Sequence, residues 1–153
     1  NKLKRKCLMN NPLYEKRKDT DAEKNGAWFD YCETVDGEGN PVPLRFKLRR
    51  CGGSNVEFLS QQEKYSKPYR HMTRKGKELT VETRAKIMIE LFCNYILVDW
   101  ENVQDEQDEF VDFSPEKAKE IFTALPDVMY ELIDEAQGEE VFLAEQRGED
   151  EKN

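Results

Sequence analysis

Oxygen-bearing side chains at Asp36, Glu38 and Asn40 give the chain its clearest candidate for ligand chemistry. Their spacing is that of the first three ligands in a calcium-binding loop. The match fails further along, because Pro41 stands where the sharp-turn glycine belongs and Lys47 where the bidentate glutamate belongs. The segment therefore predicts a turn and no calcium site.

The four cysteines, Cys7, Cys32, Cys51 and Cys93, form no CxxC pair, and their spacings match no zinc pattern. The one histidine, His71, lies in a basic segment without a cysteine or serine motif beside it. We therefore expect no metal and no cofactor. No signal peptide or membrane-spanning segment is visible, so we expect a reducing, cytoplasmic environment.

Catalytic residues are not apparent in the sequence. Acidic residues are abundant, but no pair is singled out by its position, and such abundance is typical of a solvated surface. Gly52 and Gly53 lack the GxxxxGK[ST] context of a phosphate-binding loop. We expect a protein that is not an enzyme.

Charge is distributed unevenly along the chain. Residues 99–153 hold 19 acidic and 4 basic residues, whereas residues 1–98 hold 13 acidic and 20 basic ones, within a net charge of −8. The two halves either neutralise each other within one fold or meet head to tail between copies. The candidate self-association residues are Arg45, Lys47, Arg49 and Arg50 on the basic side, and Asp105, Asp108 and Asp112 on the acidic side.

The basic segments also raise the question of nucleic-acid binding. Lysines and arginines on a strand and a helix would bind phosphates. The overall acidity and the lack of a recognition-helix motif argue against nucleic acid as a partner. An acidic C-terminal half that mimics DNA is an equally strong alternative.

The elements that must position these residues are organised around one helix, predicted over residues 81–98. Ala85, Met88, Ile89 and Phe92 fall on one helical face, and a second apolar face adjoins it. Thr80 stands where an N-cap belongs. We expect this helix to be central to the core.

A β-hairpin is predicted over residues 28–49. Aromatic and β-branched residues fill its first half, and the second half alternates apolar and basic side chains. Leu44, Phe46 and Leu48 are expected to point inward. A single hairpin is not stable in water, so it must pack on the helices or on another strand.

Three further helices are predicted. Ser54 with Glu57 forms a capping box for a helix to about Ser66, and Ser114 with Pro115 opens another. A last helix begins at Asp127. Its apolar stripe, with one later phenylalanine, is the candidate partner-binding surface, unless it completes the core. These residues are Val128, Met129, Leu132, Ile133 and Phe142.

The fold class we predict is α+β, a predominantly α-helical single domain with an N-terminal β-hairpin. The domain is expected to span residues 26–147. Residues 1–25 are predicted to form a basic, flexible segment, and residues 148–153 a disordered acidic tail.

Three stretches together resemble a known family. They are LRRCGGSNVEFL at residues 48–59, followed by KPYR at 67–70, then ILVDWENV at 96–103 and FSPEKA at 113–118. In that order they resemble the tail assembly chaperones of long-tailed bacteriophages, over about residues 26–145. One departure is that Gln104–Asp112 contains no glycine, where the family often has one.

The resemblance implies a function without catalysis. Such proteins coat the tape-measure protein, recruit tail-tube subunits and leave the finished tail. It implies the tape-measure and tail-tube proteins of the same phage as partners, a homo-oligomer, the host cytoplasm as location and no membrane. The competing hypotheses are a structural virion protein (a minor tail or head–tail connector component) and an acidic inhibitor of a host defence protein.

Overall fold

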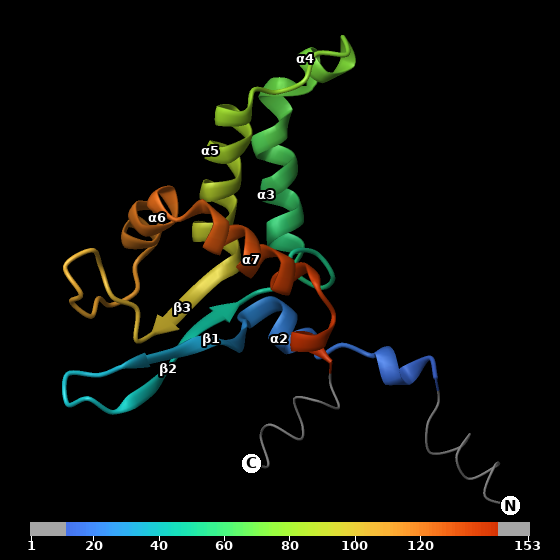
Figure 1. The fold of residues 1–153 in the computed structure, drawn as a ribbon. Helices are drawn as coiled ribbons and strands as arrows, with labels where there is room; N and C mark the ends of the chain where they lie inside the picture. Colours follow the sequence, from blue (N-terminus) through green and yellow to red (C-terminus); the bar gives the residue numbers. More distant parts are fainter. Residues whose placement is uncertain (1–11, 144–153) are drawn as a thin grey trace, which may run out of the picture.

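The computed structural model describes residues 12–143 and has one antiparallel sheet covered by helices (Figure 1). The sheet has the strand order β1-β2-β3. Its strands are β1 (Ala27–Val35), β2 (Pro41–Leu48) and β3 (Leu97–Glu101). The predicted fold class, α+β with an N-terminal hairpin, is confirmed.

The predicted hairpin is formed by β1 and β2, with Ala27 paired to Leu48 and Val35 to Pro41. The Asp36 carboxylate accepts hydrogen bonds from the backbone N–H groups of Glu38 and Asn40, both at 2.9 Å. The calcium-like spacing of these side chains is thus the chemistry of a turn.

The inward side of β2 agrees with the prediction. Phe46 and Leu48 are buried, and Leu44 is half-buried against the same core. β3 supplies the further strand that the hairpin needs, with Phe46 opposite Trp100.

Two antiparallel helices, α3 (Val56–Ser66) and α5 (Val81–Leu91), leave the body as an arm (Figure 1). The short helices η2 (Lys67–Tyr69) and α4 (Arg70–Arg74) form its far end. The end of α3 at Ser66 matches the prediction, but Lys67 keeps helical backbone angles (φ −54°, ψ −46°), so the chain continues as the 3-10 turn η2. Pro68 has no N–H to continue the α-helical hydrogen bonds.

The cap of α3 differs from the prediction. Asn55, not Ser54, accepts the hydrogen bond from the backbone N–H of Phe58, at 3.3 Å. Asn55 is buried, and its amide also donates to the Arg50 carbonyl at 3.0 Å. Ser54 has no amide to make that second bond, so the cap falls one residue later.

The central helix is shorter than predicted. It begins after the Thr80 cap as expected, but α5 ends at Leu91 and continues as the π-helical turn η3 (Phe92–Ile96). Residues 97 and 98, predicted as helix, belong to β3. The reason is tertiary, because Leu97 pairs with Leu48 and the Arg49 N–H donates to the Ile96 carbonyl at 2.7 Å.

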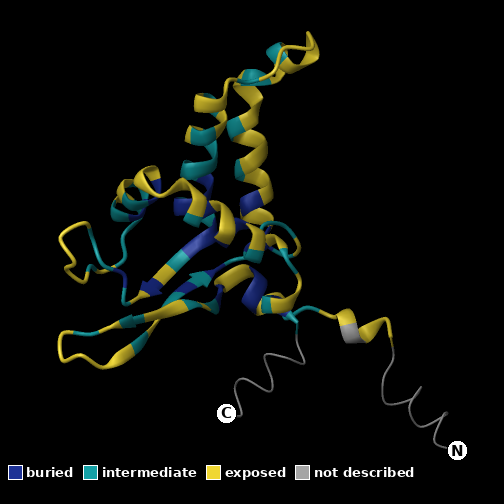
Figure 2. Cartoon of the chain, viewed as in Figure 1, coloured by how far each residue is buried: buried dark blue, intermediate teal, exposed yellow. Residues whose placement is uncertain are grey.

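Helices α6 (Pro115–Ala124) and α7 (Pro126–Gln137) complete the core. Ser114 caps α6 as predicted, accepting from the Lys117 N–H at 3.1 Å. The Phe122 ring lies against the Phe92 ring, with centroids 5.2 Å apart and planes nearly perpendicular. Figure 2 shows this buried centre and the exposed outer half of the arm.

The N-terminal boundary of the fold differs from the prediction at residue 25. Residues 14–16 form the 3-10 turn η1 (Tyr14–Lys16), and the next helix is α2 (Thr20–Asn25). Ala22 of α2 is buried in a second small core with Ala27 and Phe142, the latter from η4 (Glu140–Phe142). Thr20–Asn25 therefore belongs to the folded body. The predictions for residues 1–11 and 148–153 lie outside the described residues, as does Cys7.

Among the helices of residues 12–143, none combines the length and apolar character that crossing a membrane requires.

Candidate functional site

The acidic loop, which we define as residues 105–112, follows β3 and folds back on itself. Val111 donates its backbone N–H to the Val103 carbonyl at 3.0 Å. The Asp105 carboxylate accepts from the backbone N–H groups of Gln107 and Glu109, at 2.9 and 3.0 Å. Asp108 adopts a positive φ of 60°. Aspartate tolerates this conformation better than most residues, so the loop closes without the glycine that the resemblance led us to expect.

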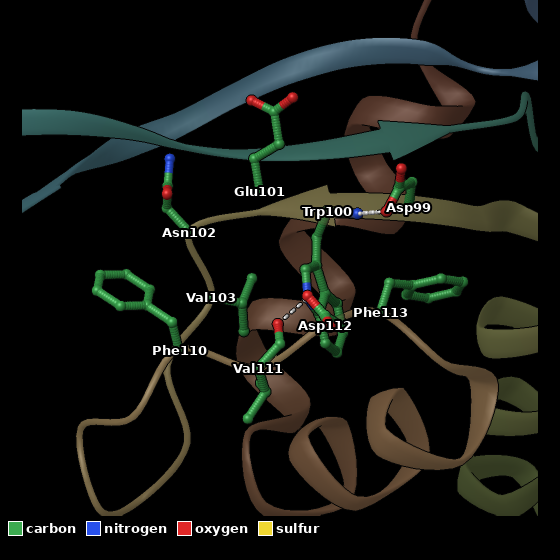
Figure 3. Close-up of a pocket in the computed structure, with 9 residues that line it drawn as sticks. All are labelled: Asp99, Trp100, Glu101, Asn102, Val103, Phe110, Val111, Asp112 and Phe113. Carbon is green, nitrogen blue, oxygen red and sulfur yellow. Dashed lines mark hydrogen bonds between the residues drawn. The ribbon is translucent and has the colours of Figure 1, made fainter. Parts of the chain in front are cut away.

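A hollow of about 460 Å³ opens between β3 and the acidic loop (Figure 3). Trp100 forms its rigid wall, because its indole Nε1–H donates to the Val111 carbonyl at 2.8 Å and its ring packs edge-on against Phe113, 5.1 Å away. Phe110 is 44% exposed at the mouth. The lining residues are Asp99, Trp100, Glu101, Asn102, Val103, Phe110, Val111, Asp112 and Phe113.

Two of the three carboxylates that line this hollow are engaged within the chain. Asp99 accepts from the Trp100 backbone N–H at 2.8 Å. Glu101 points away toward β2 (Figure 3), where it reaches Arg45 at 3.4 Å. Within residues 12–143, no three histidine, cysteine, aspartate or glutamate side chains are grouped so as to hold a metal ion. Carboxylates beside exposed aromatic rings are suited to contact cationic side chains of a partner.

A second hollow of about 260 Å³ lies on the other side of the acidic loop, against α6. Ile121, Ala124 and Leu125 supply apolar lining, and Leu125 is 51% exposed. Glu106 is exposed at its edge. The full lining is Gln104, Asp105, Glu106, Gln107, Lys117, Glu120, Ile121, Ala124 and Leu125.

The predicted basic face of β2 pairs with acids and aromatics of the same chain. The Arg45 guanidinium bonds Asp30 at 2.7 Å and lies 5.0 Å from the centre of the Trp28 ring. Lys47 lies over the same ring at 6.0 Å. These cations are neutralised or covered within the fold. Asp30 and Trp28 come from the same half of the sequence, and Glu101, 3.4 Å from Arg45, comes from the acidic half.

Arg49 and Arg50 are engaged in the same way. Arg49 lies 3.8 Å from Glu57 on α3. Arg50 pairs with Glu23 on α2, whose side chain is only 3% exposed. The Arg50–Glu23 pair ties α2 to the segment before α3, so its role in the isolated chain is structural.

The apolar stripe predicted as a partner surface lies mostly in the core. Met129, Leu132, Ile133 and Phe142 are buried, and Val128 is half-buried. The structure thus places these side chains where our alternative put them, so a surface accessible to a partner must lie elsewhere.

The end of the arm, residues 64–77, forms a basic surface, which we call the basic tip. It contains six lysines and arginines and no acidic residue. All six are exposed: Lys64, Lys67, Arg70, Arg74, Lys75 and Lys77. In the described part of the chain, Arg70 alone of the six forms an ion pair, with Glu63 at 2.7 Å.

Comparison with known protein families matches residues 53–153 to the YdaY prophage protein family. The chain belongs to this family. The match covers the arm, β3, the acidic loop, α6 and α7, and it identifies a phage-derived protein. Comparisons with curated proteins and with solved structures find no match.

Several side chains in the described part of this YdaY-family protein have a pKa above the usual value. Burial raises the pKa of Cys51 and of Cys93 to about 12, so both thiols stay protonated at neutral pH. The hydrogen bond from Tyr31 to Glu131, 2.6 Å long, raises the pKa of Tyr31, and burial adds to the effect. His71 lies exposed on α4.

Sequence reasoning identified the cations of the basic tip of this YdaY-family protein as a basic helix that would bind phosphates, but not as a surface that projects from the body. The run of cations without an acid was visible in residues 64–77, but a cation on a helix is equally compatible with an internal ion pair. Only the arm's projection from the body shows that these cations stay apart from the acids of α6 and α7 (Figure 1).

Proposed function

We propose that this YdaY-family protein is a non-catalytic phage tail assembly chaperone, which binds the tape-measure protein and helps recruit tail-tube subunits in the host cytoplasm. Two findings support the proposal. The chain belongs to a prophage protein family, and three of its stretches resemble the tail assembly chaperones.

The observation that carries the proposal is the projecting arm. α3 and α5 extend away from the body and end in the basic tip, whose cations are exposed. An arm of this kind offers an exposed helical surface to a partner, and apolar positions on such a surface are a common contact for helical segments. The exposed apolar residues on the arm are Val56, Leu59 and Val81.

Co-expression with the tape-measure and tail-tube proteins of the same phage tests the proposal. We expect the chain to co-purify with both and to be absent from finished tails. The arm variant Arg74→Glu/Lys75→Glu should weaken the capture. Its control is Arg17→Glu/Lys24→Glu, which makes the same charge change on exposed residues at the other end of the molecule from the tip (Figure 1).

Two outcomes of the experiment would overturn the proposal. A fixed copy number in purified particles would indicate a structural virion protein instead. Normal tails after deletion of the gene, with no capture of either tail protein, would favour the acidic inhibitor.

A further inference from the structure

We infer that the basic tip of one copy docks against the acidic loop and the hollow beside α6 on a second copy of the same chain. This inference deepens the proposed function, on which it rests for its role in tail assembly, because it assigns the surfaces through which copies would line up. It replaces the basic candidates predicted from the sequence, because Arg45, Arg49 and Arg50 are paired with acids of the same chain and Lys47 lies over the Trp28 ring.

The tip has the composition of a docking segment. Tyr69 and Met72 are half-buried among exposed cations, so the segment presents apolar and basic side chains together. Lys75 and Lys77 flank Gly76, which has a positive φ of 73° and turns the chain back toward α5. The turn therefore holds these cations at the far end of the arm.

The receiving surface has the complementary composition. The hollow beside α6 is lined by Ile121, Ala124 and the half-exposed Leu125, with Asp105 and Glu106 of the loop along its edge. The one lysine of the lining, Lys117, is paired with Glu120 at 3.3 Å. Glu106 and Glu109 are exposed, and among the described residues neither forms an ion pair. An apolar lining with an acidic edge fits an apolar side chain flanked by cations.

The two surfaces stay apart within one chain. Figure 1 places the tip at the far end of the arm and the acidic loop at the side of the body. Figure 2 shows both as exposed. The charges of the tip and of the loop therefore do not neutralise each other within one chain. Among the described residues, Arg70 alone of the tip cations is paired, whereas Arg45 and Arg50 both are.

A second copy satisfies both surfaces at once, and this decides the occupant. A nucleic acid would engage the tip alone, would leave the hollow empty and would meet a chain of net charge −8. Because the two surfaces differ, the contact is heterologous, and repeated contacts generate an open chain unless the rotation closes a ring.

Paired charge reversals test the inference by sedimentation of the full chain. The tip variant is Arg74→Glu/Lys75→Glu and the loop variant is Glu106→Lys/Glu109→Lys. We expect the wild type to self-associate at low salt. Each variant alone should associate at least about tenfold more weakly, and an equimolar mixture of the two should associate again, because opposite charges then face each other.

Several results would overturn the inference. They are a wild type that stays monomeric at low salt and high concentration, variants that associate like the wild type, and a mixture that does not associate. Binding of a duplex oligonucleotide at the tip without self-association would assign the tip to nucleic acid. Far-UV circular dichroism checks that both variants keep the fold, which we expect because all four side chains are exposed.

Capture of the tape-measure protein by the same variants separates this inference from the proposed function. If self-association fails while capture persists, the docking inference is wrong and the chaperone proposal stands. If the copies associate as described but capture no tail protein, the proposed function fails and the docking surfaces remain.

Discussion

Replacing Phe92 by alanine should lower the free energy of unfolding by about 3–5 kcal/mol. Phe92 is fully buried at the point where α5 becomes the π-helical turn. Its ring packs edge-on against Phe122, with centroids 5.2 Å apart. Such an aromatic pair accounts for about 0.5–1.5 kcal/mol of the loss, and the lost transfer free energy and the cavity account for the rest.

Urea unfolding followed by circular dichroism measures this loss. Val81→Ala is the matched control, because Val81 lies on the same helix but is 73% exposed, and its cost should stay within about 0.5 kcal/mol. A double-mutant cycle with Phe92→Leu and Phe122→Leu isolates the ring contact. A cost below about 1 kcal/mol for Phe92→Ala would refute the assignment of Phe92 to the centre of the core.

Three further predictions concern the remaining features of the fold. Glu23→Ala leaves the Arg50 guanidinium, which is 18% exposed, without its partner. It should lower the free energy of unfolding in urea by about 3–5 kcal/mol, and the double variant with Arg50→Ala should recover part of that loss. An unchanged urea midpoint would mean that the ion pair does not tie α2 to the body. Asp108→Ala should lower the free energy of unfolding by about 1 kcal/mol, because alanine adopts a positive φ less readily than aspartate. Asp108→Gly should leave the free energy of unfolding unchanged. Equal thermal midpoints for the two variants would contradict the positive φ. A thiol reagent should label the exposed Cys32 quickly at pH 8 and should label Cys93 only on unfolding. Burial raises the pKa of Cys93 from 9.0 to about 12, so the thiol ionises at a lower pH in the unfolded chain than in the folded one. The contribution of Cys93 to the free energy of unfolding should therefore fall as pH rises from about 9 to 12, and Cys93→Ala should remove this pH dependence.

Local chemistry was readable from the sequence. Thr80 and Ser114 cap their helices as predicted. The hydroxyl of an N-cap residue accepts a hydrogen bond from a backbone N–H three residues later, so this contact depends only on the local sequence. Phe46 and Leu48 are buried as predicted, since strict alternation on a strand leaves one face for the core.

Long-range pairing was not readable. Leu97 and Val98 continue an apolar run that fits a helix as well as a strand, and only β2, about fifty residues earlier in the chain, decides the outcome. The same holds for the site. Nothing near Arg50 in the sequence shows that its partner is Glu23, which comes from an element that we expected to be flexible.

The arm also bears on how quickly the sheet can form. β2 ends at Leu48 and β3 begins at Leu97, its neighbour in the sheet, so the chain between them must close a loop of 48 residues. For a flexible chain of that length the closure entropy costs roughly 3–4 kcal/mol beyond a constant. The arm consists of helices formed by local contacts, and its two long helices run antiparallel, so the arm itself brings Leu97 back toward Leu48. We therefore expect the helical hairpin to form before the third strand pairs. Substitutions that weaken α3 or α5 should then slow the folding of the sheet that lies at their base.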